Sequence, residues 1–133
     1  MEIRQGIDIT SVRRMKKTIE RRGMFFVRRV FTSGERRYCE NKRMKYEHYA
    51  ARFAAKEAVI KAIGVDSSSP RFREIEIRRH ATGKPYIYLS RRTRQSFGLP
   101  SKFQIELSLA HEREYAIASV IILFLRGRKK DEK

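Results

Sequence analysis

Cysteine is nearly absent from the sequence, which contains only Cys39. A single cysteine excludes a disulfide within the chain and is typical of a protein from a reducing compartment. We interpret Cys39 as a small, half-buried apolar residue. The sequence also lacks paired cysteines and the His-x-x-x-His spacing, so a zinc site is not expected.

Long apolar runs are missing as well. The longest extends from Ala116 to Leu125, is interrupted by Ser119 and is too short to span a bilayer. The first four residues, Met-Glu-Ile-Arg, lack the apolar core of a secretion signal. We therefore expect a cytoplasmic protein with no membrane partner.

Acidic residues are scarce, with 15 Asp and Glu against 32 Lys and Arg, which gives a net charge of +17. This charge predicts a polyanionic partner such as nucleic acid, a phosphorylated metabolite or an acidic protein. The imbalance is greatest from Ser11 to Arg29, where eight cations face one acid, Glu20. Solubility alone does not require such an excess, so we infer a docking surface. Its cations are Arg13, Arg14, Lys16, Lys17, Arg21, Arg22, Arg28 and Arg29.

Aromatic residues enter the basic segment at Phe25, Phe26 and Phe31, with Val30 among them. Aromatic side chains interleaved with arginine could stack on nucleic-acid bases. They fit equally well as core contacts of a helix or turn, and this is the interpretation we favour.

Helical periodicity dominates the first half of the chain. The pattern predicts a helix over 11–22 with Ser11 as N-cap, and a short helix over about 33–41. Thr32 and Glu35 form a capping box at the start of the short helix. A third helix is predicted from about Tyr46 to Gly64.

Strand patterns dominate the second half. After a Ser-rich loop over 65–70, alternation predicts a hairpin over about 75–89 and a second hairpin over about 105–125. Ser90 caps a short helix between them, and one further strand is expected over 2–9. The fold class is therefore α+β, with helices packed on an antiparallel sheet of hairpins in one domain, 1–125. The basic tail, 126–133, is expected to be disordered.

The third helix combines small residues with a charged pair. Ala51, Ala55, Ala58 and Ala62 recur at helical spacing and form a stripe that another backbone can approach closely. Gly64 supplies a left-handed C-terminal cap. Glu57 and Lys61 are four residues apart and therefore neighbours on one face. They are either an ordinary surface ion pair or a carboxylate and an ammonium at the mouth of a site.

Two carboxylates remain as candidates for chemistry once other site types are set aside. No glycine fingerprint for phosphate follows a strand, and no third group is evident that would orient His111 beside Ser108. Asp8 comes near the end of the first strand, where it either precedes a turn or serves a site. Asp8 and Glu57 together are hard oxygen ligands that suit Mg²⁺, and their basic surroundings fit phosphoryl chemistry.

Six sequence motifs appear in the order and spacing of holo-acyl-carrier-protein synthase, the short bacterial type of 4'-phosphopantetheinyl transferase. The resemblance covers about residues 3–123. The motifs are Gly6-Ile7-Asp8-Ile9, Arg14, Arg29-Val30-Phe31-Thr32 with Glu35, Ala51-Arg52-Phe53-Ala54-Ala55-Lys56-Glu57-Ala58 with Lys61 and Gly64, Gly83-Lys84-Pro85, and Ser108-Leu109-Ala110-His111.

The resemblance implies the family's fold and an enzyme that moves 4'-phosphopantetheine from coenzyme A to a serine of apo acyl carrier protein. The other product is adenosine 3',5'-bisphosphate, and the carrier serves fatty-acid or polyketide synthesis. Asp8 and Glu57 match the family's Mg²⁺ ligands, and Lys61 would act with them on a coenzyme A phosphate. Glu57, directly or through a metal-held water, is one candidate for the base. The residues lining the coenzyme pocket would be Lys61, Gly64, Lys84, Pro85, Ser108 and His111.

The resemblance also implies two kinds of protein contact. The acidic carrier would bind the basic helix through Arg14, Arg21 and Arg28. A homotrimer with sites between neighbouring chains would give the alanine stripe and the exposed strands a role in the interface.

Two departures from the family pattern affect the coenzyme pocket. Ala110 stands where a hydroxyl residue usually precedes the histidine, and Val65-Asp66-Ser67 replaces the usual Thr-Gly after Gly64. The altered loop leaves room for a second hypothesis, a binding subunit of the same fold with weakened catalysis. The third hypothesis is a nucleic-acid-binding module that uses the +17 charge.

Overall fold

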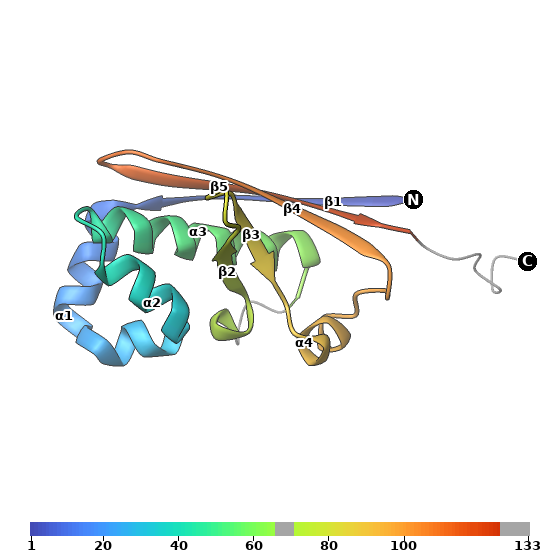
Figure 1. The fold of residues 1–133 in the computed structure, drawn as a ribbon, viewed down its shortest axis with the longest axis horizontal. Coiled ribbons are helices and arrows are strands. Elements are labelled where there is room, and N and C mark those ends of the chain that lie inside the picture. Colours follow the sequence, from blue (N-terminus) through green and yellow to red (C-terminus); the bar gives the residue numbers. More distant parts are fainter. Residues whose placement is uncertain (66–70, 126–133) are drawn as a thin grey trace, which may run out of the picture.

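Two layers make up most of the molecule, a long antiparallel sheet and the helices on one of its faces (Figure 1). The computed structural model describes residues 1–65 and 71–125. The sheet contains β1 (Glu2–Ser11), β5 (Tyr115–Phe124) and β4 (Phe103–His111), in the order β1-β5-β4. All pairings are antiparallel, so the first strand of the chain lies beside the last. The predicted α+β class and the predicted 105–125 hairpin are confirmed.

Helix α3 (Lys45–Ile63) runs along the inner face of the sheet and ends at Gly64, whose φ of 81° makes it the expected left-handed cap. Gly6 of β1 meets this helix so closely that an added Cβ would lie 1.9 Å from the carbonyl oxygen of Ala58. The alanine stripe is buried against the sheet of its own chain. The expectation that the stripe contributes to a subunit interface is therefore wrong.

The N-terminal helix is longer than its periodicity suggests. Helix α1 runs over Val12–Val30 instead of ending at residue 22, with Ser11 as its N-cap. Gly23, at φ 65° and ψ −154°, bends the helix in the middle, and the chain then resumes helical geometry. Beyond the bend Val30 and Phe31 are buried, which confirms a core role for them, whereas Phe25 is 65% exposed.

Helix α2 (Ser33–Glu40) begins with the predicted capping box, since Thr32 and Glu35 exchange both hydrogen bonds. Cys39 on this helix is fully buried, more deeply than expected, and burial raises the pKa of its thiol to about 12. Its role as a packing residue is confirmed.

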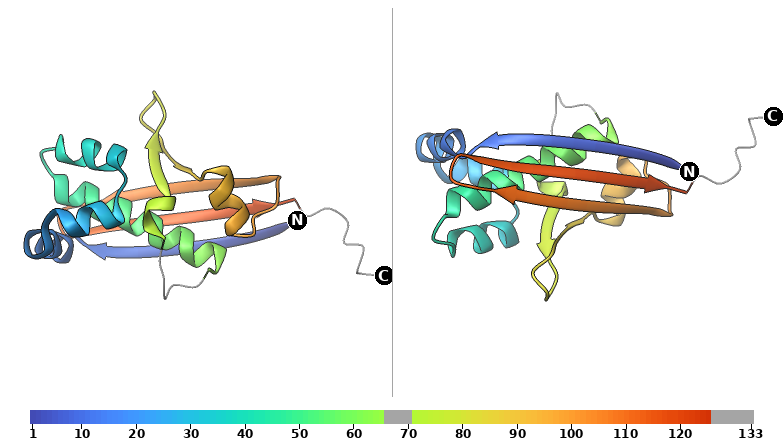
Figure 2. Two further views of the ribbon diagram at one scale, coloured as in Figure 1. Left: turned by 90° about the horizontal axis from the view of Figure 1, so that it is seen from below. Right: turned by 90° about the horizontal axis from the view of Figure 1, so that it is seen from above.

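The remaining elements lie below the sheet and beside α3. A 3₁₀ turn (Phe72–Glu74) leads into β2 (Glu76–Arg79), which pairs with β3 (Pro85–Tyr88). This hairpin is a separate two-stranded sheet, so the two predicted hairpins do not form one sheet. Its tip projects sideways past the β4 edge (Figure 2). Helix α4 (Arg91–Ser96), capped by Ser90, lies at the opposite end of the molecule from α1.

The sheet is covered on one face only. The side chains that point away from α3 include Ile7 and Ile9 of β1, each 60% exposed, and Ile117 and Ile121 of β5. No helix in the described part of the chain is long and apolar enough to cross a membrane. Residues 66–70 of the predicted 65–70 loop and the tail at 126–133 lie outside the described residues.

Candidate active site

Asp8 and Lys61 meet where β1 crosses the last turns of α3. Lys61 Nζ lies 3.1 Å from Asp8 Oδ1 and donates to the carbonyl oxygen of Ile7 at 3.0 Å. Thr10 Oγ1 donates to the other carboxylate oxygen, Asp8 Oδ2, at 3.0 Å. The ion pair of Lys61 is therefore with Asp8 on a separate element, and the simple Glu57–Lys61 surface pair is not what forms.

Glu57 lies one helical turn before Lys61 and is half-buried. Burial and the nearby negative charge of Asp8 raise the pKa of Glu57, and the charge of Lys61 opposes this effect. Two carboxylates that repel each other in this way are suited to share a divalent cation. Among the described residues no group of three or more His, Cys, Asp or Glu could hold a metal. A pair of carboxylates is still a ligand set that Mg²⁺ accepts, because this ion commonly binds one or two carboxylates and keeps sites for water and phosphate oxygens.

Gly64 and Arg4 lie next to each other beyond this cluster, at the end of α3. Arg4 Nη1 donates to the carbonyl oxygen of Ile63 at 3.0 Å and would lie 3.6 Å from a Cβ at Gly64. A cavity of about 290 Å³ is lined by Arg4 and Ile63 together with Phe97 and Phe124. Arg4 was not predicted from the sequence. Side chains alternate along a strand, so residues 4 and 8 are expected to lie on the same face of β1.

Ser108 and Lys84 lie apart from the two carboxylates. Asp8 is on the sheet face toward α3, whereas Ser108 is on the opposite, outer face, where it is aligned with Ser119 and Ile7. Lys84 and Pro85 belong to the β2–β3 hairpin, and Lys84 Nζ is 3.5 Å from Glu106 on β4.

His111 is also separate from the carboxylate cluster. Its Nδ1 is 3.0 Å from Glu47 Oε1 at the start of α3, and its ring contacts that of His48 at 4.9 Å between centroids. Glu47 precedes Glu57 by ten residues, about 15 Å along the helix. One chain therefore brings Asp8, Glu57 and Lys61 together, with Gly64 farther along at the end of α3, and holds the remaining predicted coenzyme residues elsewhere.

A basic pocket between α2, α3 and the β2–β3 hairpin was not predicted. It has a volume of about 410 Å³. Its arginines are Arg37, Arg52, Arg78 and Arg79. Arg52 is only 2% exposed, and its Nε has no hydrogen-bond partner within the part of the chain that the structure describes. The sequence placed Arg52 only in a helix motif. Its role in this pocket could not be predicted, because the residues around it, such as Tyr38, belong to other elements.

Three positively charged side chains surround the ring of Tyr38 in this pocket. Its ring is approached by Arg52 at 3.9 Å, Lys42 at 4.7 Å and Arg79 at 5.2 Å from the centroid. Next to Tyr38, burial lowers the pKa of His48 to about 4, assisted by the positive charges of His111, Arg52 and Lys42. The pocket and its surroundings are therefore suited to a phosphate-bearing ligand.

The three arginines predicted to dock a partner are all exposed on α1. Arg14 and Arg21 precede the bend at Gly23, and Arg28 follows it. None of the three has an ion-pair partner among residues 1–65 and 71–125. Phe25, beside the bend, adds an exposed apolar side chain to this basic surface.

Residues 4–120 match the model of the 4'-phosphopantetheinyl transferase superfamily. The chain belongs to this superfamily. Within it, the chain is 44% identical over 124 residues to the holo-[acyl-carrier-protein] synthase of Ruminiclostridium cellulolyticum, covering 92% of each chain. It is 43% identical to the enzyme of the same name from Chloroherpeton thalassium, covering 88% of this chain and 94% of that one. The resemblance to holo-acyl-carrier-protein synthases is confirmed.

Solved structures of phosphopantetheinyl transferases share the fold. The Chronobacterium ammoniagenes ACPS–CoA complex superposes with a TM-score of 0.83 at 26% identity, covering 95% of this chain and all of that one. Helicobacter pylori holo-[acyl-carrier-protein] synthase in complex with coenzyme A gives a TM-score of 0.77 at 32% identity, covering 90% and 99%. The expected phosphopantetheinyl transferase fold and enzyme class are thus confirmed.

Proposed function

We propose that this chain transfers 4'-phosphopantetheine from coenzyme A to a serine of apo acyl carrier protein, with adenosine 3',5'-bisphosphate as the second product. The observation that carries the proposal is the meeting of Asp8, Glu57 and Lys61 at one point in a chain of this family. Carboxylates and an ammonium placed together suit transfer of a phosphate-linked group. The coenzyme complexes of two structural relatives agree with coenzyme A as the donor.

Asp8 and Glu57 are the proposed Mg²⁺ ligands. When bound, the ion would stabilise negative charge on the pyrophosphate of coenzyme A. Lys61 holds the Asp8 carboxylate in place and, at 54% side-chain exposure, keeps hydrogen-bonding capacity for a phosphate oxygen. Gly64, at the exposed end of α3, leaves the backbone accessible to the coenzyme.

The basic pocket is proposed to bind the nucleotide end of coenzyme A. Arg52, Arg78 and Arg79 provide guanidinium groups for phosphate, and Tyr38 and Tyr86 provide ring surfaces. The hairpin that forms one wall of the pocket also carries Lys84 and Pro85. A structural relative from Bacillus anthracis is described as a complex with CoA (3',5'-ADP), which is the ligand type that this pocket suits.

A homotrimer with sites between chains is proposed from the arrangement of the sheet. Ser108 faces away from Asp8, so a pocket that uses both residues needs two copies of the chain. The outer sheet face is apolar at Ile7, Ile9 and Ile117, and an exposed patch of this kind is typical of a protein interface.

The proposed carrier surface is α1, where Arg14, Arg21 and Arg28 would attract an acidic protein. The proposed setting is the cytoplasm and the supply of holo carrier for fatty-acid or polyketide synthesis. For the nucleic-acid hypothesis only Phe25 stays exposed beside the arginines, since Phe31 is buried and Phe26 packs on the core.

One incubation tests the proposal. The protein is mixed with coenzyme A, Mg²⁺ and each of several apo acyl carrier proteins, and the carriers are weighed by mass spectrometry. The expected result is a phosphopantetheine group added to at least one carrier, and none without Mg²⁺. If no carrier gains this mass, the proposed function is wrong.

A further inference from the structure

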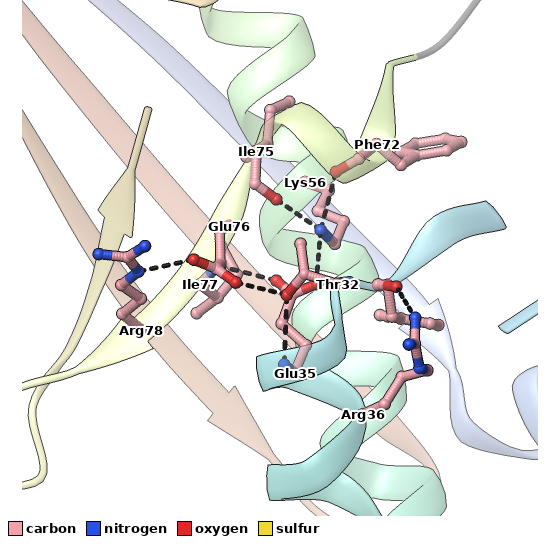
Figure 3. A network of polar contacts seen from close by, with 10 residues as sticks. Thr32, Glu35, Arg36, Lys56, Phe72, Ile75, Glu76, Ile77 and Arg78 are labelled. Atoms are coloured by element: carbon pink, nitrogen blue, oxygen red, sulfur yellow. Dashed lines mark hydrogen bonds and ion pairs between the residues drawn. The ribbon is translucent and has the colours of Figure 1, made fainter. Parts of the chain in front are cut away.

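A fully buried ion pair joins α2 to α3 beneath the sheet. Lys56 Nζ lies 2.8 Å from Glu35 Oε1, and both side chains are 0% exposed (Figure 3). Lys56 immediately precedes the proposed metal ligand Glu57, but its side chain is buried in the protein whereas that of Glu57 is half-buried. Burying two charges is costly, and apolar residues of similar volume often stabilise a core as well. The position of this pair therefore needs an explanation other than stability.

The Glu35 carboxylate fixes β2 directly. Its Oε2 accepts a hydrogen bond from the backbone amide of Ile77 at 2.8 Å, and its Oε1 accepts one from the amide of Thr32 at 2.8 Å. A single side chain thus connects the start of α2 to the first strand of the hairpin.

Lys56 fixes the segment that leads into the hairpin. Its ammonium donates to the carbonyl oxygens of Phe72 at 2.8 Å and Ile75 at 2.5 Å, in addition to Glu35. All three donors of the ammonium are used. The chain from the 3₁₀ turn to β2 is therefore attached to α3 at two successive points.

The network continues from the core to the basic pocket. Thr32 Oγ1 donates to Glu76 Oε2 at 2.5 Å, and Arg78 Nε donates to Glu76 Oε1 at 2.6 Å. Arg78 lines the pocket, and the same hairpin ends in Lys84 and Pro85. The polar contacts of Figure 3 thus run from Lys56 on α3 to Arg78, which lines the basic pocket.

We propose that Lys56 and Glu35 are positioning residues that hold the β2–β3 hairpin at the place on α3 where it binds the nucleotide end of coenzyme A. This inference rests on the proposed function, which assigns the hairpin to the coenzyme. Two neighbouring residues of α3 then serve two different parts of the coenzyme site, here called half-sites. Glu57 acts at the carboxylate cluster, and Lys56 acts through the hairpin that lines the basic pocket.

The test uses the double variant Glu35→Gln/Lys56→Met, which removes both charges while nearly keeping their volumes. Ile122→Val, a small change in a buried sheet residue away from the hairpin, is the control for a general loss of stability. Circular dichroism and melting establish that each variant is folded. The readouts are KM for coenzyme A, kcat, and Kd for adenosine 3',5'-bisphosphate by calorimetry.

For the double variant we expect KM and Kd to rise on the order of tenfold to a hundredfold, as for other groups that orient a binding residue. The kcat at saturating coenzyme should stay within about twofold, since Asp8, Glu57 and Lys61 are unchanged. Hydrogen exchange should also show lost protection at the amide of Ile77. Ile122→Val should change none of these. A folded double variant with wild-type KM and Kd overturns the proposal.

Two further measurements keep the result decisive. If the double variant does not fold, Lys56→Arg retains the charge with a different geometry, and an unchanged Kd for the bisphosphate then overturns the proposal while a raised one supports it. If the wild-type protein transfers no phosphopantetheine, the proposed function fails on its own. The positioning role is then judged from bisphosphate binding and exchange at Ile77, which need no transfer.

Discussion

Lys61 on α3 forms an ion pair with Asp8 on β1 at 3.1 Å, although 53 residues separate them in sequence. The same ammonium also holds the carbonyl oxygen of Ile7. Lys61 therefore holds the carboxylate of β1 against α3, the helix that also carries Glu57. This relationship makes the cluster testable by single substitutions.

Glu57→Gln should abolish transfer and leave the fold intact. The amide keeps the shape but removes a hard anionic ligand, so kcat/KM should fall by at least about a hundredfold. Because burial and Asp8 already raise the pKa of Glu57, losing its charge should not lower the melting temperature. Glu114→Gln, a change at an exposed carboxylate, is the matched control and should retain activity. Full activity in Glu57→Gln would remove this residue from the metal site.

Reversing two charges on α1 should weaken carrier binding selectively. The variant Arg14→Glu/Arg21→Glu replaces attraction with repulsion toward an acidic protein, so KM for the carrier should rise at least about tenfold and KM for coenzyme A should not change. The effect should shrink at high salt. The control is Arg92→Glu on α4, at the other end of the molecule, which should behave as wild type. An unchanged KM for the carrier would contradict the docking surface.

Mixing two inactive variants should restore activity if each site uses two chains. Glu57→Gln impairs the carboxylate half-site, and His111→Ala impairs the half-site that the neighbouring chain supplies. In random trimers from an equal mixture each half-site is intact in half of the cases, so about a quarter of the sites should be fully intact. The variants are unfolded together in denaturant, refolded and assayed. Glu57→Gln mixed with Asp8→Asn has both defects in one half-site and should gain nothing. Equal results in the two mixtures would show that the sites do not lie between chains.

Acid should destabilise the protein through His48. Burial, and then the charge of His111, lowers the pKa of His48 from 6.5 to about 4 in the folded state. The unfolded chain binds this proton from about pH 6.5 downward while the folded chain does not, so the free energy of unfolding should fall as pH drops from 6.5 to 4. Urea denaturation at several pH values measures the slope. His48→Gln should flatten it, and an unchanged slope would contradict the assignment.

Local sequence signals predicted most of the secondary structure, because they depend on residues close in sequence. The Thr32–Glu35 capping box and the left-handed cap at Gly64 are of this kind, and both form as expected. The end of the first helix was not predicted correctly by such signals. The helical pattern was expected to stop at residue 22, yet Gly23 adopts one positive φ and α1 continues to Val30.

Contacts between distant segments could not be predicted from pattern. Alternation in β1 shows that Ile7 and Ile9 share a face, but only the packing of α3 decides that this face stays uncovered. Arg52 and Lys56 read as ordinary helix cations, whereas their partners, Tyr38 and Glu35, are supplied by α2. The pairing of Asp8 with the α3 cluster was likewise expected only through the family resemblance.

The close approach at Gly6 has a consequence for the two carboxylates. Gly6 and Asp8 share one face of β1, and the oxygen that a Cβ at residue 6 would strike belongs to Ala58, the residue after Glu57. Any side chain at residue 6 would push the strand off the helix and carry Asp8 away from Glu57. The absence of a side chain at Gly6 thus sets the distance between Asp8 and Glu57, across which the two carboxylates would share a cation.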